Sequence, residues 1–256
     1  MLCRRLYDRE YESPCANLSS VKILAVISGK GGSAKTTTSV ALAGLMHAAG
    51  RRVVLVDLDP VGGATDAAGI DPASLEAGVA DVLSGAVQPK RAIVTVHEGY
   101  GLLGASPRLI GEENRALATF PKLRTIDADV VILDLAPGFG RFSQAAAKVA
   151  DRILVPVLAE PLAVRTVQYV LGMLDGVDAR AKLIGILPTM YEPRRLLSGD
   201  QLAELLKLGN VLPPIPRSVV ASEAVLAGRS VVAYAPKSPV SEAYRALAAR
   251  IEQALA

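Results

Sequence analysis

Cysteine is nearly absent from this sequence. Its two cysteines, Cys3 and Cys15, both lie within the first twenty residues, so no disulfide framework can hold the fold together. The lack of any later cysteine also argues against an iron–sulfur centre, which needs paired thiolates. Nothing resembles the apolar segment of a secretion signal, and we therefore expect a cytoplasmic protein.

Aromatic residues and long apolar runs are also scarce. Aromatic residues make up 4% of the chain, whereas hydrophobic residues make up 51%. No apolar run approaches the roughly 20 residues that a membrane-spanning helix needs. This composition suits a sheet of valines and isoleucines covered by alanine-rich helices, and 256 residues are enough for one large α/β domain.

A strong charge of either sign is missing as well. The formal net charge is +3. From Arg180 onward ten Lys and Arg residues face six Asp and Glu residues, a net +4, while residues 21–179 hold 15 against 16, a net −1. This modest basic bias in the last third is explained equally well by a solvated helix face and by a DNA-binding surface.

What the sequence does contain is a glycine-rich stretch, S-G-K-G-G-S-A-K-T-T-T, at residues 28–38. An apolar run at 21–27 precedes it, and a small-residue helical pattern at 39–49 follows it. The order of strand, glycine-rich turn and helix is typical of a phosphate-binding loop, where backbone N–H groups and a helix N-terminus meet the anion. Lys35 would then reach the β- and γ-phosphates, and the Thr36 hydroxyl would ligate Mg²⁺.

Ala34 departs from the strict loop pattern, because it stands where a second glycine is usual. Alanine adopts a positive φ at a steric cost, whereas glycine does not. The interpretation as a phosphate loop therefore predicts a negative φ at Ala34.

Acidic residues follow two other predicted strands. Asp57 and Asp59 lie at the end of the apolar run 52–56, and Asp134 ends the run 129–134. In a doubly wound sheet, the carboxyl ends of the strands lie beside the bound ligand. The second run has the apolar-then-acidic form of a Walker B strand, which predicts that Asp134 lies on the metal side.

The alternation of strands and helices over 21–256 predicts one doubly wound, mostly parallel sheet with helices on both faces. Residues 1–20 show no clear period and are expected to form a weakly ordered extension. Further strands are expected at 93–96, 100–103, 153–158, 183–187 and 211–215, and helices at 74–83 (with Ser74 as N-cap), 112–118, 160–174, 219–227 and 239–256, the last with Val240, Tyr244, Leu247, Ile251 and Leu255 on its core-facing stripe.

The loop resembles the variant Walker A motif of the ParA/MinD family, K-G-G-x-x-K-[ST]-T, which residues 30–37 match. In that family the first lysine, here Lys30, crosses a dimer interface to the partner's nucleotide. Residues 57–65 are similar to the family's D-x-D-P-Q-G-N-A-T, with Val61 in place of glutamine and Gly63 in place of asparagine. The resemblance implies that Asp59 orients or activates the attacking water.

Two C-terminal segments extend the resemblance. Residues 188–191 and 214–218 are similar to the segments that sandwich adenine and carry an I-P-R motif, and residues 222–224 match S-E-A. The resemblance thus implies a catalytic set of Lys30, Lys35 and Asp59, a nucleotide-binding set of Gly29, Lys30, Gly31, Gly32, Ser33, Ala34, Lys35, Thr36, Thr37, Met190 and Pro216, and a metal set of Thr36, Asp59 and Asp134.

The function that the resemblance implies is that of a partition ATPase for chromosomes or plasmids, with ATP and Mg²⁺ as cofactors. ATP would drive homodimerisation, the dimer would bind nonspecific double-stranded DNA at the nucleoid, and a ParB-type protein would stimulate slow hydrolysis. DNA contacts are expected from Arg194, Arg195, Arg217, Arg229, Lys237 and Arg245, although Val220 and Ser238-Pro239 stand where relatives often carry basic residues.

Three questions stay open at this point. A MinD-like protein would act on a membrane, but the final helix has a mixed-charge face, so membrane binding is not expected, whereas another cargo remains an alternative. A metabolic kinase or synthetase on the same fold would need a substrate-binding insertion, for which the short middle region offers little room. Glu160 fits a helix cap and an active-site residue equally well.

Overall fold

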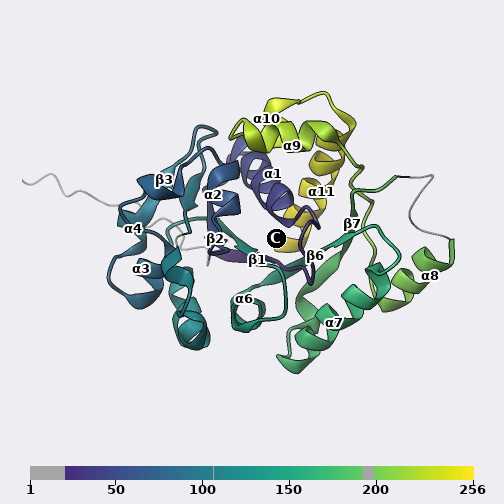
Figure 1. Ribbon diagram of the computed structural model, residues 1–256, viewed down its shortest axis with the longest axis horizontal. Coiled ribbons are helices and arrows are strands. Elements are labelled where there is room, and N and C mark those ends of the chain that lie inside the picture. Colours follow the sequence, from purple (N-terminus) through teal and green to yellow (C-terminus); the bar gives the residue numbers. More distant parts are fainter. Residues whose placement is uncertain (1–20, 106, 193–198) are drawn as a thin grey trace, which may run out of the picture.

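A seven-stranded sheet forms the centre of the computed structural model, which describes residues 21–105, 107–192 and 199–256 (Figure 1). The strand order is β3-β4-β2-β5-β1-β6-β7, and every neighbouring pair is parallel except β3 and β4. The expected fold class is thereby confirmed, while the expected extension at 1–20 lies outside the described residues. The strands are β1 (Lys22–Val26), β2 (Val53–Leu58), β3 (Ile93–Thr95), β4 (Gly101–Leu103), β5 (Val130–Leu135), β6 (Arg152–Leu158) and β7 (Leu183–Thr189).

Helices cover both faces of this sheet, and two separate hydrophobic clusters fill the two layers. One layer packs against α1 (Lys35–Ala48), α2 (Gly63–Ala67), α9 (Val219–Leu226), α10 (Val231–Tyr234) and α11 (Pro239–Leu255). The other packs against α3 (Val79–Ser84), α4 (Pro89–Ala92), α5 (Ala116–Thr119), α6 (Arg141–Val149), α7 (Ala163–Gly176) and α8 (Gly199–Leu208).

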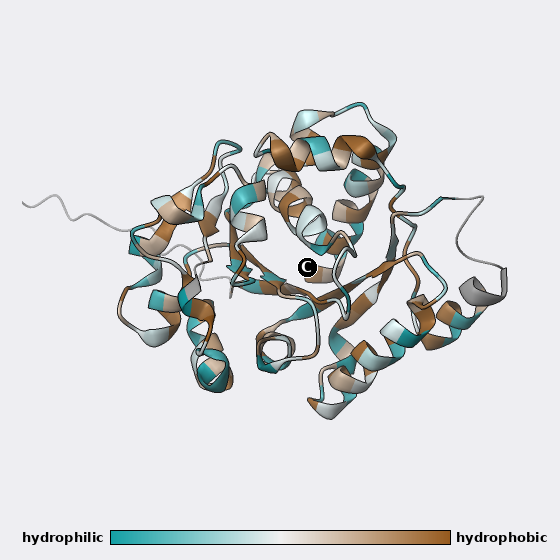
Figure 2. Cartoon of the chain, viewed as in Figure 1, coloured by the Kyte–Doolittle hydropathy of each residue, from teal (hydrophilic) through white to brown (hydrophobic). Residues whose placement is uncertain are grey.

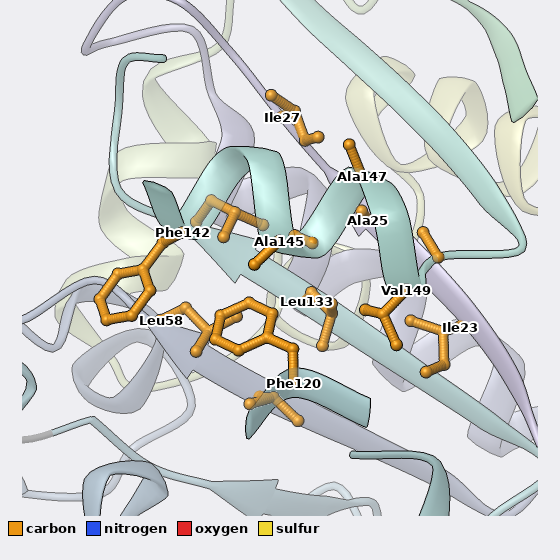
Figure 3. Packing of buried hydrophobic residues seen from close by; sticks show 14 of the residues in the cluster. Ile23, Ala25, Ile27, Leu58, Phe120, Leu133, Phe142, Ala145, Ala147 and Val149 are labelled. Carbon is orange, nitrogen blue, oxygen red and sulfur yellow. The ribbon is translucent and has the colours of Figure 1, made fainter. Parts of the chain in front are cut away.

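The strands are apolar on both sides because both sides are covered. On β1, Leu24 and Val26 belong to the α1 layer, whereas Ile23 and Ala25 belong to the α6 layer. Figure 3 shows the α6 layer, where the rings of Phe120 and Phe142 stack with centroids 5.6 Å apart. In Figure 2 the surrounding helices carry hydrophobic and hydrophilic residues side by side, as elements with one buried face do.

Helix α11 packs its apolar stripe onto the α1 layer. All five stripe residues that the sequence predicts are buried there: Val240, Tyr244, Leu247, Ile251 and Leu255. Ser238 caps the helix, since its Oγ accepts a hydrogen bond from Ser241 N. Within the described ranges, no helix is both long and apolar enough to cross a lipid bilayer.

The prediction that Ser74 caps a helix is wrong. Residues 72–74 form a separate 3-10 turn, which Asp71 caps by accepting a hydrogen bond from Ala73 N. Helix α3 begins only at Val79, where Asp81 accepts from Gly78 N. A Cβ atom at Gly78 would lie 2.7 Å from Gly104 O, so the close approach of these two backbone segments requires glycine at the N-cap of α3.

The prediction of a strand at 211–215 is also wrong. This segment runs beside β7 but forms only isolated bridges, Ile186 with Val211 and Tyr191 with Pro216. Pro213 and Pro214 have no N–H to donate, so a regular hydrogen-bond ladder cannot continue through them. The sheet therefore ends at β7.

Candidate functional site

The glycine-rich loop joins β1 to α1 at the carboxyl end of the central strands (Figure 1). Buried hydroxyl groups donate hydrogen bonds to its carbonyl groups. Ser28 Oγ donates to Lys30 O at 3.0 Å, and Thr189 Oγ1, at the end of β7, donates to Ser33 O at 3.0 Å. Among the described residues, no acceptor is found for the backbone N–H groups of residues 30–37. The carbonyls are thus held by the protein, and the N–H groups remain available to an anion.

Ala34 adopts a left-handed conformation, with φ 53° and ψ 26°, so the prediction of a negative φ is wrong. Ala34 is the N-cap of α1, and its carbonyl accepts from Thr38 N at 2.9 Å and Thr38 Oγ1 at 2.8 Å. Two hydrogen bonds to one oxygen offset a backbone cost of about 1–2 kcal/mol. The loop therefore stores strain at the position where the usual motif has glycine.

Replacing Ala34 by glycine should release this strain. We expect Ala34→Gly to raise the free energy of unfolding by about 0.5–1 kcal/mol, because glycine adopts positive φ freely but loses more entropy on folding. Thermal or urea unfolding without nucleotide measures the change. Ala246→Gly, on the exposed face of α11, is the matched control and should destabilise by about 1 kcal/mol. If Ala34→Gly and Ala246→Gly destabilise the protein equally, Ala34 is not strained.

Asp134, at the end of β5, gathers the polar groups of α1. Its Oδ2 accepts from Thr36 Oγ1 and its Oδ1 from Ser39 Oγ, each at 2.8 Å, while Lys35 Nζ lies 3.6 Å from Oδ1. Burial raises the pKa of the Asp134 carboxyl, and the Lys35 ammonium opposes this rise. A hydroxyl and a carboxylate side by side are ligands that suit Mg²⁺, which usually takes few protein groups and completes its shell with phosphate oxygens and water.

Asp57 lies directly opposite Asp134 on the neighbouring strand β2. Its Oδ2 accepts from Thr65 N and Thr65 Oγ1, both at 2.8 Å, and its Oδ1 accepts from Asp59 N. Burial, together with repulsion from Asp134, raises the pKa of Asp57 to about 7. Asp57 thus organises the turn that carries Asp59, and the half-buried Asp59 accepts from Val61 N through Oδ1.

Lys30 does not point into the loop with Lys35. Its ammonium forms an ion pair with Glu160 Oε1 at 2.6 Å, and half of the Lys30 side chain is exposed. Helix α7 begins at Ala163 with Leu162 as N-cap and no side-chain cap, so Glu160 is not a helix cap. Of the two roles that the sequence left open for Glu160, the structure excludes the helix cap. The Glu160 carboxylate instead forms an ion pair with Lys30, beside the loop.

A cavity of ≈ 470 Å³ adjoins the loop at the ends of β6 and β7. Met190, whose φ is 52°, contributes to its wall, and the neighbouring Pro216 forms the bridge with Tyr191. The volume is within the usual range for a small-molecule site. The lining residues are Leu158, Ala159, Glu160, Met190, Arg217, Ser218, Val219 and Ser222.

Four of the basic residues expected to contact DNA lie in or beside α9, α10 and α11, namely Arg217, Arg229, Lys237 and Arg245. Arg217 pairs with Glu192 at 2.8 Å, and Arg245 donates to Pro236 O at 2.7 Å. Arg229 and Lys237 are exposed and form no ion pair with the described part of the chain. Arg194 and Arg195 lie outside the described residues.

Several hydroxyl-bearing residues of this site were not predicted as site residues. Ser28, Thr38, Ser39 and Thr189 each bond to the loop or to Asp134. Thr38 and Ser39 continue the hydroxyl run that starts at Thr36, and that run was a usable signal. Thr189 had no local signal, because its contact with Ser33 joins residues that are 156 positions apart.

Comparison with known proteins agrees with this geometry. The model of the AAA domain family matches residues 21–184. The chromosome-partitioning ATPase Soj of Thermus thermophilus is 36% identical over 92% of this chain and 99% of its own length. A crystal structure titled cobyrinic acid a,c-diamide synthase, from Mycobacterium smegmatis with bound ATP analogue and magnesium, is 34% identical, with a TM-score of 0.77 over 91% of this chain and 95% of that one.

The fold alone is shared more widely. The cell division ATPase MinD of Pyrococcus furiosus superposes with a TM-score of 0.79 at 22% identity, covering 91% of this chain and 98% of that one. The loop motif, the acidic strand ends and these similarities together show that the chain belongs to the ParA/MinD family of P-loop ATPases, which hydrolyse ATP with Mg²⁺ as cofactor.

Proposed function

We propose that this chain is a ParA-type partition ATPase whose ATP-bound homodimer binds nonspecific DNA and is reset by slow hydrolysis that a ParB-type partner stimulates. The cargo is a chromosome or plasmid at the cytoplasmic nucleoid. The similarity to the Thermus protein named chromosome-partitioning ATPase Soj supports the class of function. The observation that carries the proposal is the separation of the two loop lysines: Lys35 lies buried at Asp134, whereas Lys30 lies half exposed at Glu160.

Within one subunit, the loop binds the phosphates. The N–H groups of residues 30–37 surround the anion, and the Lys35 ammonium neutralises its charge. Thr36 and Asp134 would hold the metal, which when bound neutralises charge that develops on the transferred phosphoryl group. Met190 and residues 217–219 line the adjoining cavity, where the base would fit.

Asp59 is the residue that we assign to the attacking water. It stands at the end of β2, two residues beyond the buried Asp57, and only one of its carboxylate oxygens is used by the turn. A second oxygen remains to orient water towards the terminal phosphate, which is the main contribution that a side chain can make to this reaction.

Lys30 provides the link between nucleotide and dimer. An exposed ion pair contributes only about 0–1 kcal/mol, so Lys30 can leave Glu160 readily. A phosphate of the second subunit offers more charge than a single carboxylate does, and it would therefore compete well for this lysine. ATP binding is thereby coupled to the formation of the dimer.

Lys30→Gln should bind ATP nearly as well as the parent but should lose ATP-dependent dimers and the DNA binding that depends on them. Sedimentation measures the dimer, and a titration with nonspecific double-stranded DNA measures binding with ATP, ADP or no nucleotide across salt concentrations. The parent should bind only with ATP, and its affinity should fall steeply with salt. The proposal is refuted if the parent binds DNA equally well with and without ATP, or if Lys30→Gln still forms the ATP-dependent dimer.

The same titration locates the surface. The double variant Arg229→Glu/Lys237→Glu changes two exposed residues that flank α10. Lys90→Glu/Arg91→Glu makes the same change in charge on α4, which packs in the layer on the other face of the sheet. Only the first should weaken DNA binding, because fewer phosphate contacts release fewer counterions. Equal effects would indicate bulk charge rather than a defined surface.

A synthase activity is the second candidate, because the Mycobacterium smegmatis structure with that title is 34% identical and almost fully covered. An enzyme of that class would hydrolyse ATP together with an acid substrate and would not need DNA. ATP-dependent DNA binding by the parent separates the two functions. A MinD-like role at a membrane has less support, since the apolar stripe of α11 is buried in the core.

A further inference from the structure

Tyr244, in the last helix, reaches the phosphate loop from the far end of the chain. Its side chain is fully buried in the α1 layer, and its hydroxyl lies 3.2 Å from Thr38 Oγ1, although the two residues are 206 positions apart. Thr38 is fully buried too, and its Oγ1 bonds to the carbonyl of the strained Ala34 at 2.8 Å. A chain of two hydroxyls therefore connects α11 to the loop.

The direction of this chain follows from counting hydrogens. Thr38 has one hydroxyl hydrogen, which it donates to Ala34 O, so towards Tyr244 it can only accept. Tyr244 must then be the donor. Burial raises the pKa of the Tyr244 hydroxyl to about 12, so the tyrosine keeps this hydrogen at any ordinary pH. Donation to Thr38 Oγ1 strengthens the bond that Thr38 makes in turn, because hydrogen bonds in a chain polarise one another.

The position of Ala34 O determines the direction of the next N–H. The described part of the chain contains no cis peptide, and in a trans peptide the C=O of one residue and the N–H of the next point in opposite directions. With Ala34 O held towards Thr38, inside α1, the N–H of Lys35 points out of the helix N-terminus. That is the direction from which a phosphate approaches.

We propose that Tyr244 is a positioning residue for nucleotide binding. Through Thr38 it holds Ala34 in the left-handed conformation, in which the N–H of Lys35 faces the phosphate. This inference rests on the proposed function of the loop. Glycine at position 34 would adopt the orientation without support, whereas alanine requires it. The last helix thus takes over part of the conformational role that a second glycine plays in the usual motif.

Tyr244→Phe should weaken ATP–Mg²⁺ and ADP–Mg²⁺ binding alike, by about three- to tenfold, since both nucleotides present a β-phosphate to the loop. The kcat should change much less than the KM, because the reacting groups are untouched. Isothermal titration well below the unfolding temperature measures the affinities. The matched control is Tyr100→Phe: Tyr100 is a buried tyrosine of the same layer whose hydroxyl has no partner in the described residues, and this variant should bind nucleotide as the parent does.

Changes at Thr38 test the same connection without altering α11. Thr38→Val should weaken nucleotide binding at least as much as Tyr244→Phe does. Thr38→Ser, which keeps the hydroxyl, should bind nucleotide as the parent does. In the Thr38→Val background, Tyr244→Phe should add no further loss, since the connection is already broken. Parent-like affinity of Tyr244→Phe, or full additivity of the two changes, would overturn the proposal, and the Thr38 pair decides the question if Tyr244→Phe does not fold.

Lys35→Ala separates this inference from the function on which it rests. If Lys35→Ala still binds ATP, the loop is not the phosphate site and the proposed function fails. If Lys35→Ala loses ATP while Tyr244→Phe binds normally, the loop assignment stands and only the role of Tyr244 is refuted.

Discussion

ATP–Mg²⁺ binding by the Lys35→Ala variant is expected to be at least about 100-fold weaker than binding by the parent protein. The Lys35 ammonium is the buried cation at the loop, with a 6% exposed side chain 3.6 Å from Asp134. Its removal deletes charge-assisted hydrogen bonds to phosphate, each about 1.5–3 kcal/mol. It also leaves the Asp134 carboxylate without its neighbouring positive charge. The uncompensated carboxylate then repels the incoming phosphate. Titration calorimetry with excess Mg²⁺ measures the loss.

The control for this variant is the other loop lysine. Lys30→Gln removes one positive charge from the same loop, but Lys30 is exposed and paired with Glu160, so ATP affinity should change by no more than about threefold. If the two variants lose similar affinity, net charge explains the effect. If Lys35→Ala binds ATP within threefold of the parent, the phosphate loop has been assigned to the wrong residues.

Much of the fold could be predicted because its signals are local. The apolar run before the loop, the glycines and the helix after it are contiguous, and so are the strand and carboxylate that end at Asp134. The stripe on α11 follows from helical periodicity alone. Where two prolines interrupt an apolar run, at 213 and 214, the same reasoning gave a strand that the missing N–H groups do not allow.

The conformation of the loop could not be predicted, since it depends on residues remote in sequence. At Ala34, local sterics favour a negative φ, yet Thr38, four residues along, donates two hydrogen bonds to Ala34 O in the left-handed conformation. Thr38 is in turn contacted by Tyr244, which is 206 positions further along the chain. Local preference was overridden by tertiary contacts. The pairing of Lys30 with Glu160 likewise joins residues 130 positions apart, so sequence reasoning could name both residues without relating them.

Two carboxylates packed together in the core make stability depend on pH. Asp57 and Asp134 are both fully buried and lie opposite each other on β2 and β5. The pKa of Asp57 is raised to about 7 in the folded protein, from 3.8 for an ordinary aspartate. Between these two values the folded state binds more protons than the unfolded state does. The free energy of unfolding therefore falls as pH rises through this window and levels off above pH 7.

Asp57→Asn should remove most of this fall in the free energy of unfolding with rising pH. The amide cannot ionise, so the variant should gain stability over the parent by about 2–3 kcal/mol more at pH 8 than at pH 5, measured by urea unfolding without nucleotide or Mg²⁺. Comparing two pH values cancels the cost of the hydrogen bond that Asp59 N loses, because that cost does not depend on pH.

Asp66→Asn is the matched control, since Asp66 is an exposed carboxylate on α2, nine residues along the chain from Asp57. Its stability difference from the parent should be small and nearly equal at the two pH values. If Asp57→Asn behaves in the same way, Asp57 is ionised in the folded protein throughout this range, and the charge is compensated by its hydrogen bonds to Thr65. In that case the turn carrying Asp59 is held by a carboxylate, and its geometry should be independent of pH from 5 to 8.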